Sequence, residues 1–358
     1  MHHNGGAGQL IYTMPLMVEN QMLNVQLDTG TSDLWLASTA CKSDSCSSGN
    51  SYQVALFDPA GSPDQRIAFS LEYVNGAASG TIRTSNITVS GTNLTLIHQA
   101  FGSAITVSNE PMDTGNFTGI IGLGPPAGSA LQDSLYNNTG NPNPLNDVSD
   151  AASTGSLLAG IWTGRPLGAR YISLGLQRLP SEGGKGDSVL TISELDPGYA
   201  SNRTEMQYTP AIGPDGQSGV PAHWSTYLTQ IEIDVGGQTL GVPPGGSFGT
   251  QYPIATFSSG APVSLAPASV LNVIYGAYGY QPGSDGGYYV PCDLMMNITL
   301  YLGTSSVKVP IHPLDASIYQ VNGDPKYCFG GIQSITGANG AVAGQDKLQA
   351  DFVIGAPL

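Results

Sequence analysis

Short runs of alternating apolar and polar residues, separated by turns rich in Gly, Pro and Asn, occupy almost the whole chain. Alternation with a period of two is typical of strands, because successive side chains point to opposite faces of a sheet. The pattern predicts strands over residues 10–18, 22–27, 82–89 and 93–100. Helical patterns are few and short, and predict helices over residues 133–136 and 268–278. We therefore predict an all-β fold with many hairpins.

A faint internal repeat divides the chain. VQLDTGTSDLWLAS at residues 25–38 and IATFSSGAPVSLAPAS at residues 254–269 share an apolar run, a Gly turn and a second apolar run. The alignment pairs Asp28 with Ser258, Thr29 with Ser259, Gly30 with Gly260, and Thr31 with Ala261. An apolar-apolar-Gly run follows each copy at a similar distance, ending at Gly122 and Gly355. We predict two lobes of one fold, residues 1–187 and 188–358.

Two stretches between the strand patterns are rich in turn-forming residues. Residues 125–156 predict a long surface loop with a short helix, and residues 213–219 predict a second loop.

The net charge of −15, from 26 acidic residues against 11 Lys and Arg, excludes nucleic acid and anionic membrane as partners. Such a surface suits an acidic medium, although it also serves solubility alone. No apolar run is long enough to span a bilayer. The first residues contain no apolar signal segment, so we expect a secretory signal to be absent or removed.

Four cysteines allow three pairings, and the sequence alone does not choose among them. Pairing within each half is the simplest, and the spacing is unlike that of a zinc site. We expect oxidised cysteines and an extracellular, secreted protein. Six N-glycosylation sequons, against about three expected by chance, agree with this. They begin at Asn86, Asn93, Asn116, Asn137, Asn202 and Asn297.

The tripeptide Asp-Thr-Gly is weak evidence alone, and it recurs at residues 113–115 in what the sequence predicts to be a loop. The copy at Asp28 lies between apolar strands and continues to Leu34 and Trp35. This longer string resembles the first active-site motif of the pepsin-family aspartic peptidases. The resemblance extends to Phe57-Asp58-Pro59, to a flap-like segment at residues 72–76 followed by Gly80, and to residues 119–124 and 224–237.

The resemblance implies an all-β, bilobal pepsin-like fold, with two β-barrel-like lobes related by a pseudo-twofold axis and a groove between them. It also implies the disulfides Cys41–Cys46 and Cys292–Cys328. In the family a last hairpin follows the segment that matches residues 351–358, so we expect a truncated or differently closed second lobe, and a sheet edge prone to association.

The family's chemistry uses two aspartates that share a proton and hold one water. The resemblance implies that Asp28 is catalytic and that Ser258 stands where the second Asp would be. The hydroxyl after the second Gly is also absent, at Ala261, and Pro262 follows it. Because serine cannot replace an acid of pKa near 4, we predict that catalysis is impaired or lost.

The resemblance assigns further roles around this pair. The residues implied to bind substrate are Gly30, Thr31, Tyr73, Gly76, Gly260 and Ala261. The residues implied to support them are Trp35, which would bond the flap tyrosine, Thr29 and Ser259.

Other chemistries are less favoured. A serine mechanism at Ser258 needs a base, and His98, His223 and His312 lack a triad-like context. His2 and His3 are two terminal histidines and do not indicate a metal, and we expect no cofactor. Three hypotheses remain open: a binding protein for extended peptides or proteins, an active acid endopeptidase, and a protein inhibitor. We expect a monomer with a peptide or protein ligand between the lobes.

Overall fold

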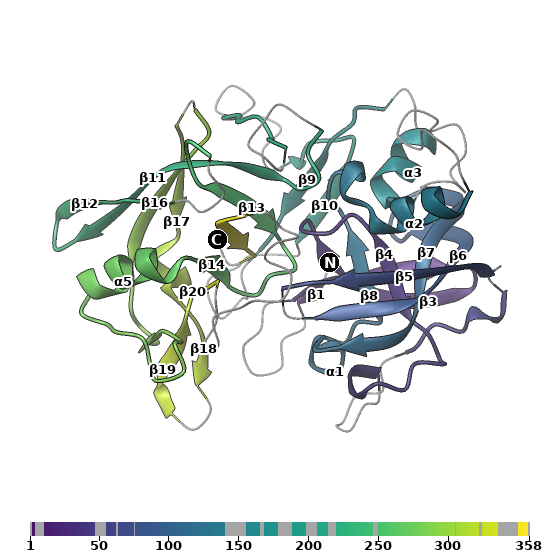
Figure 1. Cartoon of the computed structure of the whole chain (residues 1–358), viewed down its shortest axis with the longest axis horizontal. Helices are drawn as coiled ribbons and strands as arrows, with labels where there is room; N and C mark the ends of the chain where they lie inside the picture. The colour runs from purple at the N-terminus through teal and green to yellow at the C-terminus, as the bar shows by residue number, and fades with distance from the viewer. Residues whose placement is uncertain are drawn as a thin grey trace. The chain divides into compact units, whose positions relative to one another are not determined.

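The computed structural model describes residues 2–3, 11–46, 55–61, 64–74, 76–139, 155–164, 168–177, 188–197, 206–213, 220–245, 250–304, 306–321, 324–335 and 350–356. The fold is mostly β, as predicted, and divides into two compact units (Figure 1). The first unit includes Ile11–Met206 and the second includes Gln207–Leu358. Among the described helices, none has the length and apolar character needed to cross a bilayer.

The first unit contains the following strands: β1 (His2–His3), β2 (Tyr12–Val18), β3 (Gln21–Asp28), β4 (Leu34–Ala37), β5 (Asp64–Glu72), β6 (Ala77–Val89), β7 (Thr95–Ser108), β8 (Gly119–Gly122), β9 (Ile172–Gly175) and β10 (Val189–Ile192). Its α-helices are α1 (Met112–Gly115), α2 (Ala130–Thr139) and α3 (Leu157–Gly164). Its 3-10 turns are η1 (Asp44–Cys46), η2 (Pro59–Gly61) and η3 (Pro126–Gly128).

Strands β1 to β8 form one sheet in the order β1-β2-β3-β8-β4-β7-β6-β5, and β2 also pairs with β6. This last pairing closes the sheet into a barrel. Strand β3 shows why the sequence folds so: Leu23, Val25 and Leu27 alternate along it and are at most 3% exposed. The barrel interior also takes Trp35, which is fully buried.

The boundary between the units differs from the one expected at residues 187 and 188. The described residues 188–197 and Met206 belong to the first unit. The cause is local pairing, because β10 joins β9 as an antiparallel two-stranded sheet.

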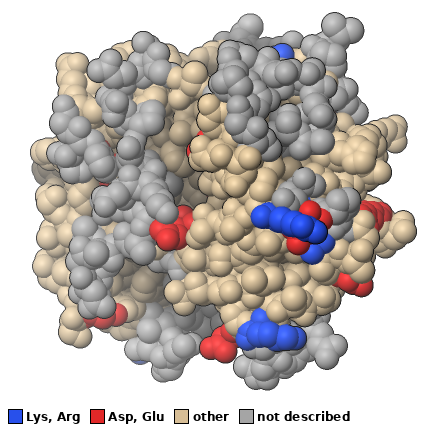
Figure 2. All heavy atoms as spheres, turned by 45° about the vertical axis from the view of Figure 1, so that its right-hand side comes forward, with Lys and Arg blue, Asp and Glu red and all other residues tan. Residues whose placement is uncertain are grey.

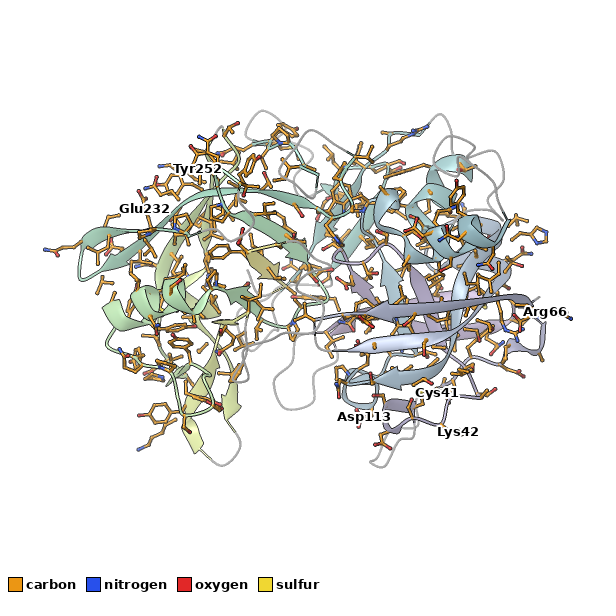
Figure 3. The ribbon with its side chains drawn as sticks, viewed as in Figure 1. Cys41, Lys42, Arg66, Asp113, Glu232 and Tyr252 are labelled. Carbon is orange, nitrogen blue, oxygen red and sulfur yellow. A yellow bond between two sulfur atoms is a disulfide. The ribbon has the colours of Figure 1, made fainter. Side chains whose placement is uncertain are left out.

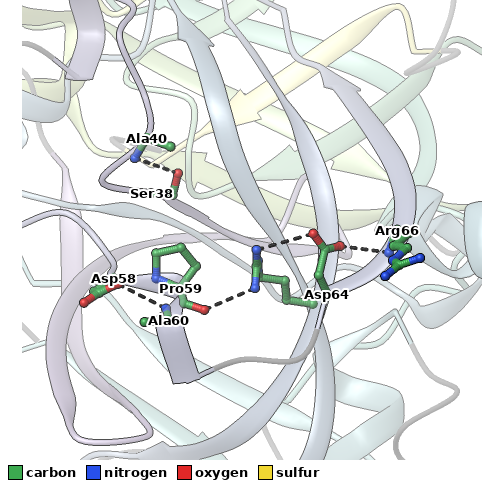
Figure 4. A network of polar contacts seen from close by, with 8 residues as sticks. Ser38, Ala40, Asp58, Pro59, Ala60, Asp64 and Arg66 are labelled. Carbon is green, nitrogen blue, oxygen red and sulfur yellow. Dashed lines mark hydrogen bonds and ion pairs between the residues drawn. The ribbon is translucent and has the colours of Figure 1, made fainter.

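A polar network fixes the loop that follows β4 (Figure 4). Arg83 on β6 donates to the Pro59 carbonyl at 3.1 Å and pairs with Asp64 at 3.4 Å. Asp64 also accepts the backbone N–H of Arg66, so one carboxylate joins strand β5 to strand β6. This is the single ion pair among the described residues, and Figure 2 shows correspondingly few charged side chains on the face that it displays.

The Cys41–Cys46 disulfide closes a short loop that ends in η1, at an S–S distance of 2.07 Å. Turn η1 packs against α1. Figure 3 labels Cys41, which is disulfide-bonded to Cys46 of η1, and Asp113 of α1. The second Asp-Thr-Gly copy therefore lies in helix α1, so the expectation of a plain loop there was wrong.

The second unit contains the following strands: β11 (Ser225–Val235), β12 (Gln238–Val242), β13 (Ile254–Ser258), β14 (Ser264–Ala266), β15 (Tyr289–Pro291), β16 (Asn297–Leu302), β17 (Val307–Ile311), β18 (Ser317–Val321), β19 (Asp324–Gly330), β20 (Ile332–Ser334) and β21 (Phe352–Gly355). It also contains helix α5 (Ala268–Ala277) and the 3-10 turn η7 (Pro313–Ala316). The larger sheet has the order β17-β16-β11-β13-β21-β14-β20, with β12 on β11, and β15-β19-β18 form a smaller one.

Helix α5 packs its apolar face against the larger sheet. Leu271 and Tyr275 are fully buried, and the Tyr275 ring stacks on Tyr288 with centroids 4.4 Å apart. The Tyr275 hydroxyl donates to the Ile332 carbonyl at 2.8 Å, which satisfies the polar end of a buried ring. The Cys292–Cys328 disulfide joins strand β19 to the turn after β15.

The predicted elements are confirmed, although β6, β7 and α2 extend well beyond the predicted ranges. The strands predicted over residues 10–18 and 22–27 are β2 and β3, and those over 82–89 and 93–100 belong to β6 and β7. The helices predicted over residues 133–136 and 268–278 are α2 and α5. Of the two predicted loops, residues 140–154 and 214–219 lie outside the described part of the chain.

Candidate functional site

Asp28 is the last residue of β3 and lies where this strand runs parallel to β8, opposite Gly122. The Leu123 N–H donates to its carbonyl at 2.8 Å, and the Gly30 N–H donates to its Oδ1 at 2.7 Å. The residue is 7% exposed. A tight turn thus holds one carboxylate at the end of a buried strand, and Thr29, Gly30 and Thr31 form that turn.

The second unit repeats this arrangement. Ser258 is the last residue of β13, which runs parallel to β21 and places Ser258 opposite Gly355. In the first unit the strand after the turn, β4, pairs antiparallel with β8. In the second unit the corresponding strand, β14, pairs antiparallel with β21. Ser258 therefore occupies in its unit the register position that Asp28 occupies in the first.

The chemistry of the two turns differs. Ser258 is partly exposed, and its carbonyl accepts the Ala261 N–H at 3.2 Å. A hydroxyl replaces a carboxylate at the end of the strand, and the methyl group of Ala261 replaces the hydroxyl of Thr31. The second turn, including Ser259 and Gly260, contains no acid.

Strands β5 and β6 form a hairpin whose end lies near Asp28. Glu72 pairs with Ala77, and the Tyr73 N–H donates to the Gly76 carbonyl at 2.7 Å. The Tyr73 hydroxyl accepts the indole N–H of Trp35 at 2.7 Å, which joins this flap hairpin to the barrel core. Burial, followed by the charges of Glu110, Asp33 and Asp28, raises the pKa of Tyr73 well above its usual value.

Asp33 is a second buried carboxyl, only 1% exposed, and the sequence offered no reason to single it out. The Ser129 hydroxyl donates to its Oδ1 at 2.5 Å, and the Ala130 N–H donates to its Oδ2 at 2.9 Å. Asp33 therefore accepts donors from the start of helix α2 and ties that helix to β4. Burial outweighs these donors and raises the pKa of Asp33 to about 7.

Glu110 is a third carboxyl that sequence reasoning missed. It follows strand β7 and lies against Gly76 of the flap hairpin. Burial, and then the charge of Asp28, raises the pKa of Glu110 to about 8. Its sequence neighbourhood contains no motif, because the closeness of Glu110 to Gly76 arises from the β6–β7 pairing.

The unfolding free energy of the first unit is expected to fall as the pH rises from 4 to 7. The Asp33 carboxyl prefers its neutral form when folded, so its stabilising contribution is complete below the unfolded pKa and is lost as pH rises through about 7. The shift corresponds to about 4 kcal/mol at most. Urea unfolding at several pH values measures this fall in the unfolding free energy.

Asp33→Asn is expected to reduce this dependence and to leave the part due to Glu110, whose pKa is also raised. We expect a loss of about 1 kcal/mol at pH 4, because an amide cannot accept from every donor. Asp113→Asn on α1 serves as the control and should retain the parent's slope. An Asp33→Asn variant with the full pH dependence would contradict the assignment to Asp33.

Both disulfides implied by the resemblance are present, Cys41–Cys46 and Cys292–Cys328. Five of the six sequon asparagines lie in the described residues, and all five are exposed. These are Asn86, Asn93, Asn116, Asn137 and Asn297, whereas Asn202 lies outside the described residues.

Comparison with known proteins agrees with this geometry. Residues 12–147 match the family model for eukaryotic aspartyl protease. The chain is 25% identical over 331 residues to an aspartic protease of Phaffia rhodozyma, covering 90% of this chain and 68% of that protein. It is 25% identical over 326 residues to cathepsin E of Mus musculus, covering 90% and 70%. This chain is a homologue of the pepsin-like aspartic proteases.

The fold of this pepsin-like homologue is also similar to that of a solved aspartic proteinase. The crystal structure of aspartic proteinase from Irpex lacteus superposes with a TM-score of 0.63, covering 98% of this chain and 91% of that one at 16% identity. The family match over residues 12–147 contains Asp28, the flap hairpin and β8 of the pepsin-like homologue. The turn at Ser258 lies outside that match.

Proposed function

We propose that this chain is a secreted, glycosylated pepsin-like homologue that binds extended peptides and cleaves them weakly or not at all. The observation that carries the proposal is the register of the two turns, Asp28 opposite Gly122 and Ser258 opposite Gly355. In the family's mechanism these two positions supply the carboxylates that share a proton and activate one water. Here only the first position supplies a carboxylate.

Cleavage needs a general base and a general acid together. Asp28 can accept a proton from water, but the serine hydroxyl cannot donate to the scissile carbonyl as a carboxylic acid does. Each role is worth about two to four orders of magnitude in rate. The proposed loss of one role therefore leaves a site that binds substrate without turning it over efficiently.

Binding relies on parts that the first unit keeps. The flap hairpin ends at Tyr73 and Gly76, and the indole of Trp35 anchors the Tyr73 hydroxyl. A hairpin end next to a strand-end turn can offer backbone hydrogen bonds to an extended chain. We propose Gly30, Thr31, Tyr73, Gly76, Gly260 and Ala261 as the binding residues, with Thr29, Trp35 and Ser259 as supports.

A secreted location is proposed on two grounds. Both cysteine pairs are disulfide-bonded, which is typical of oxidising compartments. The described sequon asparagines are exposed, so their side-chain amides can accept glycans.

The test is a fluorescein-labelled apolar decapeptide mixed with the chain between pH 3 and 6. We expect anisotropy to report binding while mass spectrometry shows the peptide intact. Tyr73→Ala is expected to weaken binding at least about tenfold, because a flap aromatic is the type of residue that dominates binding energy. Tyr208→Ala, at a side chain 74% exposed, is the matched control and should bind as the parent does.

Two other outcomes of this test would favour the endopeptidase or the inhibitor hypothesis. Rapid cleavage by the parent that Asp28→Ala abolishes would overturn the proposal in favour of an acid endopeptidase. Absence of binding by the parent would overturn it in favour of a protein that acts through its outer surface, such as an inhibitor.

A further inference from the structure

The carboxyl of Glu110 fills a space in the flap hairpin that only glycine leaves open. A Cβ on Gly76 would lie 2.1 Å from Glu110 Oε1 and 3.0 Å from the Ser108 carbonyl oxygen. Strand β7 ends at Ser108, opposite Ala77 at the start of β6. The side chain of Glu110 therefore packs directly on the backbone of the hairpin end.

Two acidic groups lie near this carboxyl. Asp28 from β3 and the Tyr73 hydroxyl from the hairpin are close enough to interact with it electrostatically, and Tyr73 also experiences the charge of Asp33. The Ser108 carbonyl adds a further negative dipole end. The one ion pair among the described residues, Arg83–Asp64, involves none of these groups.

We propose that Glu110 is a positioning residue that holds the flap hairpin in place while it is protonated, and that its ionisation releases the hairpin. The neutral carboxyl packs against Gly76 with little desolvation cost, whereas the carboxylate in the same place is poorly solvated and repelled by Asp28. Ionisation of Glu110 therefore favours conformations in which the carboxylate reaches water. Because the carboxylate packs on Gly76, such a movement frees the hairpin end.

The consequence for ligand binding rests on the proposed function. Tyr73 and Gly76 are proposed binding residues, so a released hairpin binds an extended peptide less tightly. The pKa of Glu110, raised to about 8, sets the pH range of the change. The flap hairpin is therefore held in place in acidic medium and is released above neutral pH.

Amide hydrogen exchange tests the positioning role without any ligand. The amide of Tyr73 is hydrogen-bonded to the Gly76 carbonyl, so its exchange reports opening of the hairpin. The amide of Leu123 is hydrogen-bonded to the Asp28 carbonyl, so its exchange reports opening of the barrel. After correction for intrinsic rates, we expect Tyr73 protection to fall about tenfold between pH 6 and pH 9, because the charged form predominates tenfold one unit above the pKa. Leu123 protection should fall less, because this amide reports only the general loss of stability that the ionisation of Asp33 causes.

Two variants distinguish Glu110 from a general effect of pH. Glu110→Gln keeps the shape of the neutral carboxyl and should retain Tyr73 protection at pH 9 within about threefold. Glu72→Gln, an exposed carboxyl of the same hairpin, should behave as the parent. Equal losses at Tyr73 and Leu123, or the same pH dependence in Glu110→Gln, would overturn the proposal.

The labelled decapeptide separates this proposal from the proposed function. With the parent, its dissociation constant is expected to rise about tenfold from pH 6 to pH 9, and with Glu110→Gln to stay nearly constant. A peptide that fails to bind at any pH would overturn the proposed function. The exchange measurement would still decide the role of Glu110.

Discussion

Replacing Ser258 with aspartate is expected to raise cleavage of an apolar decapeptide at acid pH by at least about a hundredfold over the parent. The register of β13 and β21 places residue 258 as β3 and β8 place Asp28, so the new carboxylate would end the same kind of strand. In the family's mechanism, carboxylates at these two positions share a proton, which supplies the acid that serine lacks. Peptide fragments counted over time between pH 2.5 and 6 measure the gain.

Three variants make this result specific. Asp28→Ala in the Ser258→Asp background should abolish the gain, because both carboxylates are required. Ala261→Thr added to Ser258→Asp should increase it, since it restores the hydroxyl present at Thr31. Ser269→Asp, an exposed position on α5, adds the same charge elsewhere and should leave activity at the parent's level. A Ser258→Asp variant as silent as Ser269→Asp would contradict our account of the missing acid.

Gly119→Ala is expected to destabilise the first unit by at least about 3 kcal/mol. A Cβ there would lie 2.0 Å from the Trp35 carbonyl oxygen and 2.9 Å from the Leu36 Cα. Both are backbone atoms of β4, which flanks β8 on one side while β3 flanks it on the other. Neither neighbour can move without breaking a ladder, so β8 would separate from its partners. The midpoint of urea unfolding measures the loss.

The control lies on a strand with open space. Gly241 on β12 has no atom within 4 Å of the position that a Cβ would occupy. Gly241→Ala should therefore change the unfolding free energy by no more than about 0.5 kcal/mol. If Gly119→Ala and Gly241→Ala unfold at the same urea concentration, the packing argument for β8 is wrong.

The repeat shows how far a sequence pattern can predict this fold. The spacing from Asp28 to Gly122 resembles that from Ser258 to Gly355, and each pair proves to be a parallel strand contact. The prediction succeeded because a buried central strand needs apolar residues followed by glycine at a close approach. Those requirements leave a visible pattern even where the chemistry of the turn has changed.

The boundary between the units was less predictable. The pairing of β9 with β10 places Val189–Ile192 in the first unit, whereas the sequence suggested a break at 187. A two-stranded pairing of short, partly buried strands has a weak hydrophobic pattern. Its partners can be identified only from the folded chain.

By itself, the sequence determined the all-β class, the two-unit organisation, the turn at Asp28 with its serine counterpart, and the pepsin-like resemblance. These depend on local patterns and residue types, which are readable in order along the chain. The burial of Asp33 and the position of Glu110 against Gly76 were decided only by the tertiary structure. Both depend on which strands pair across long separations, and burial by those pairings is what raises the two pKa values.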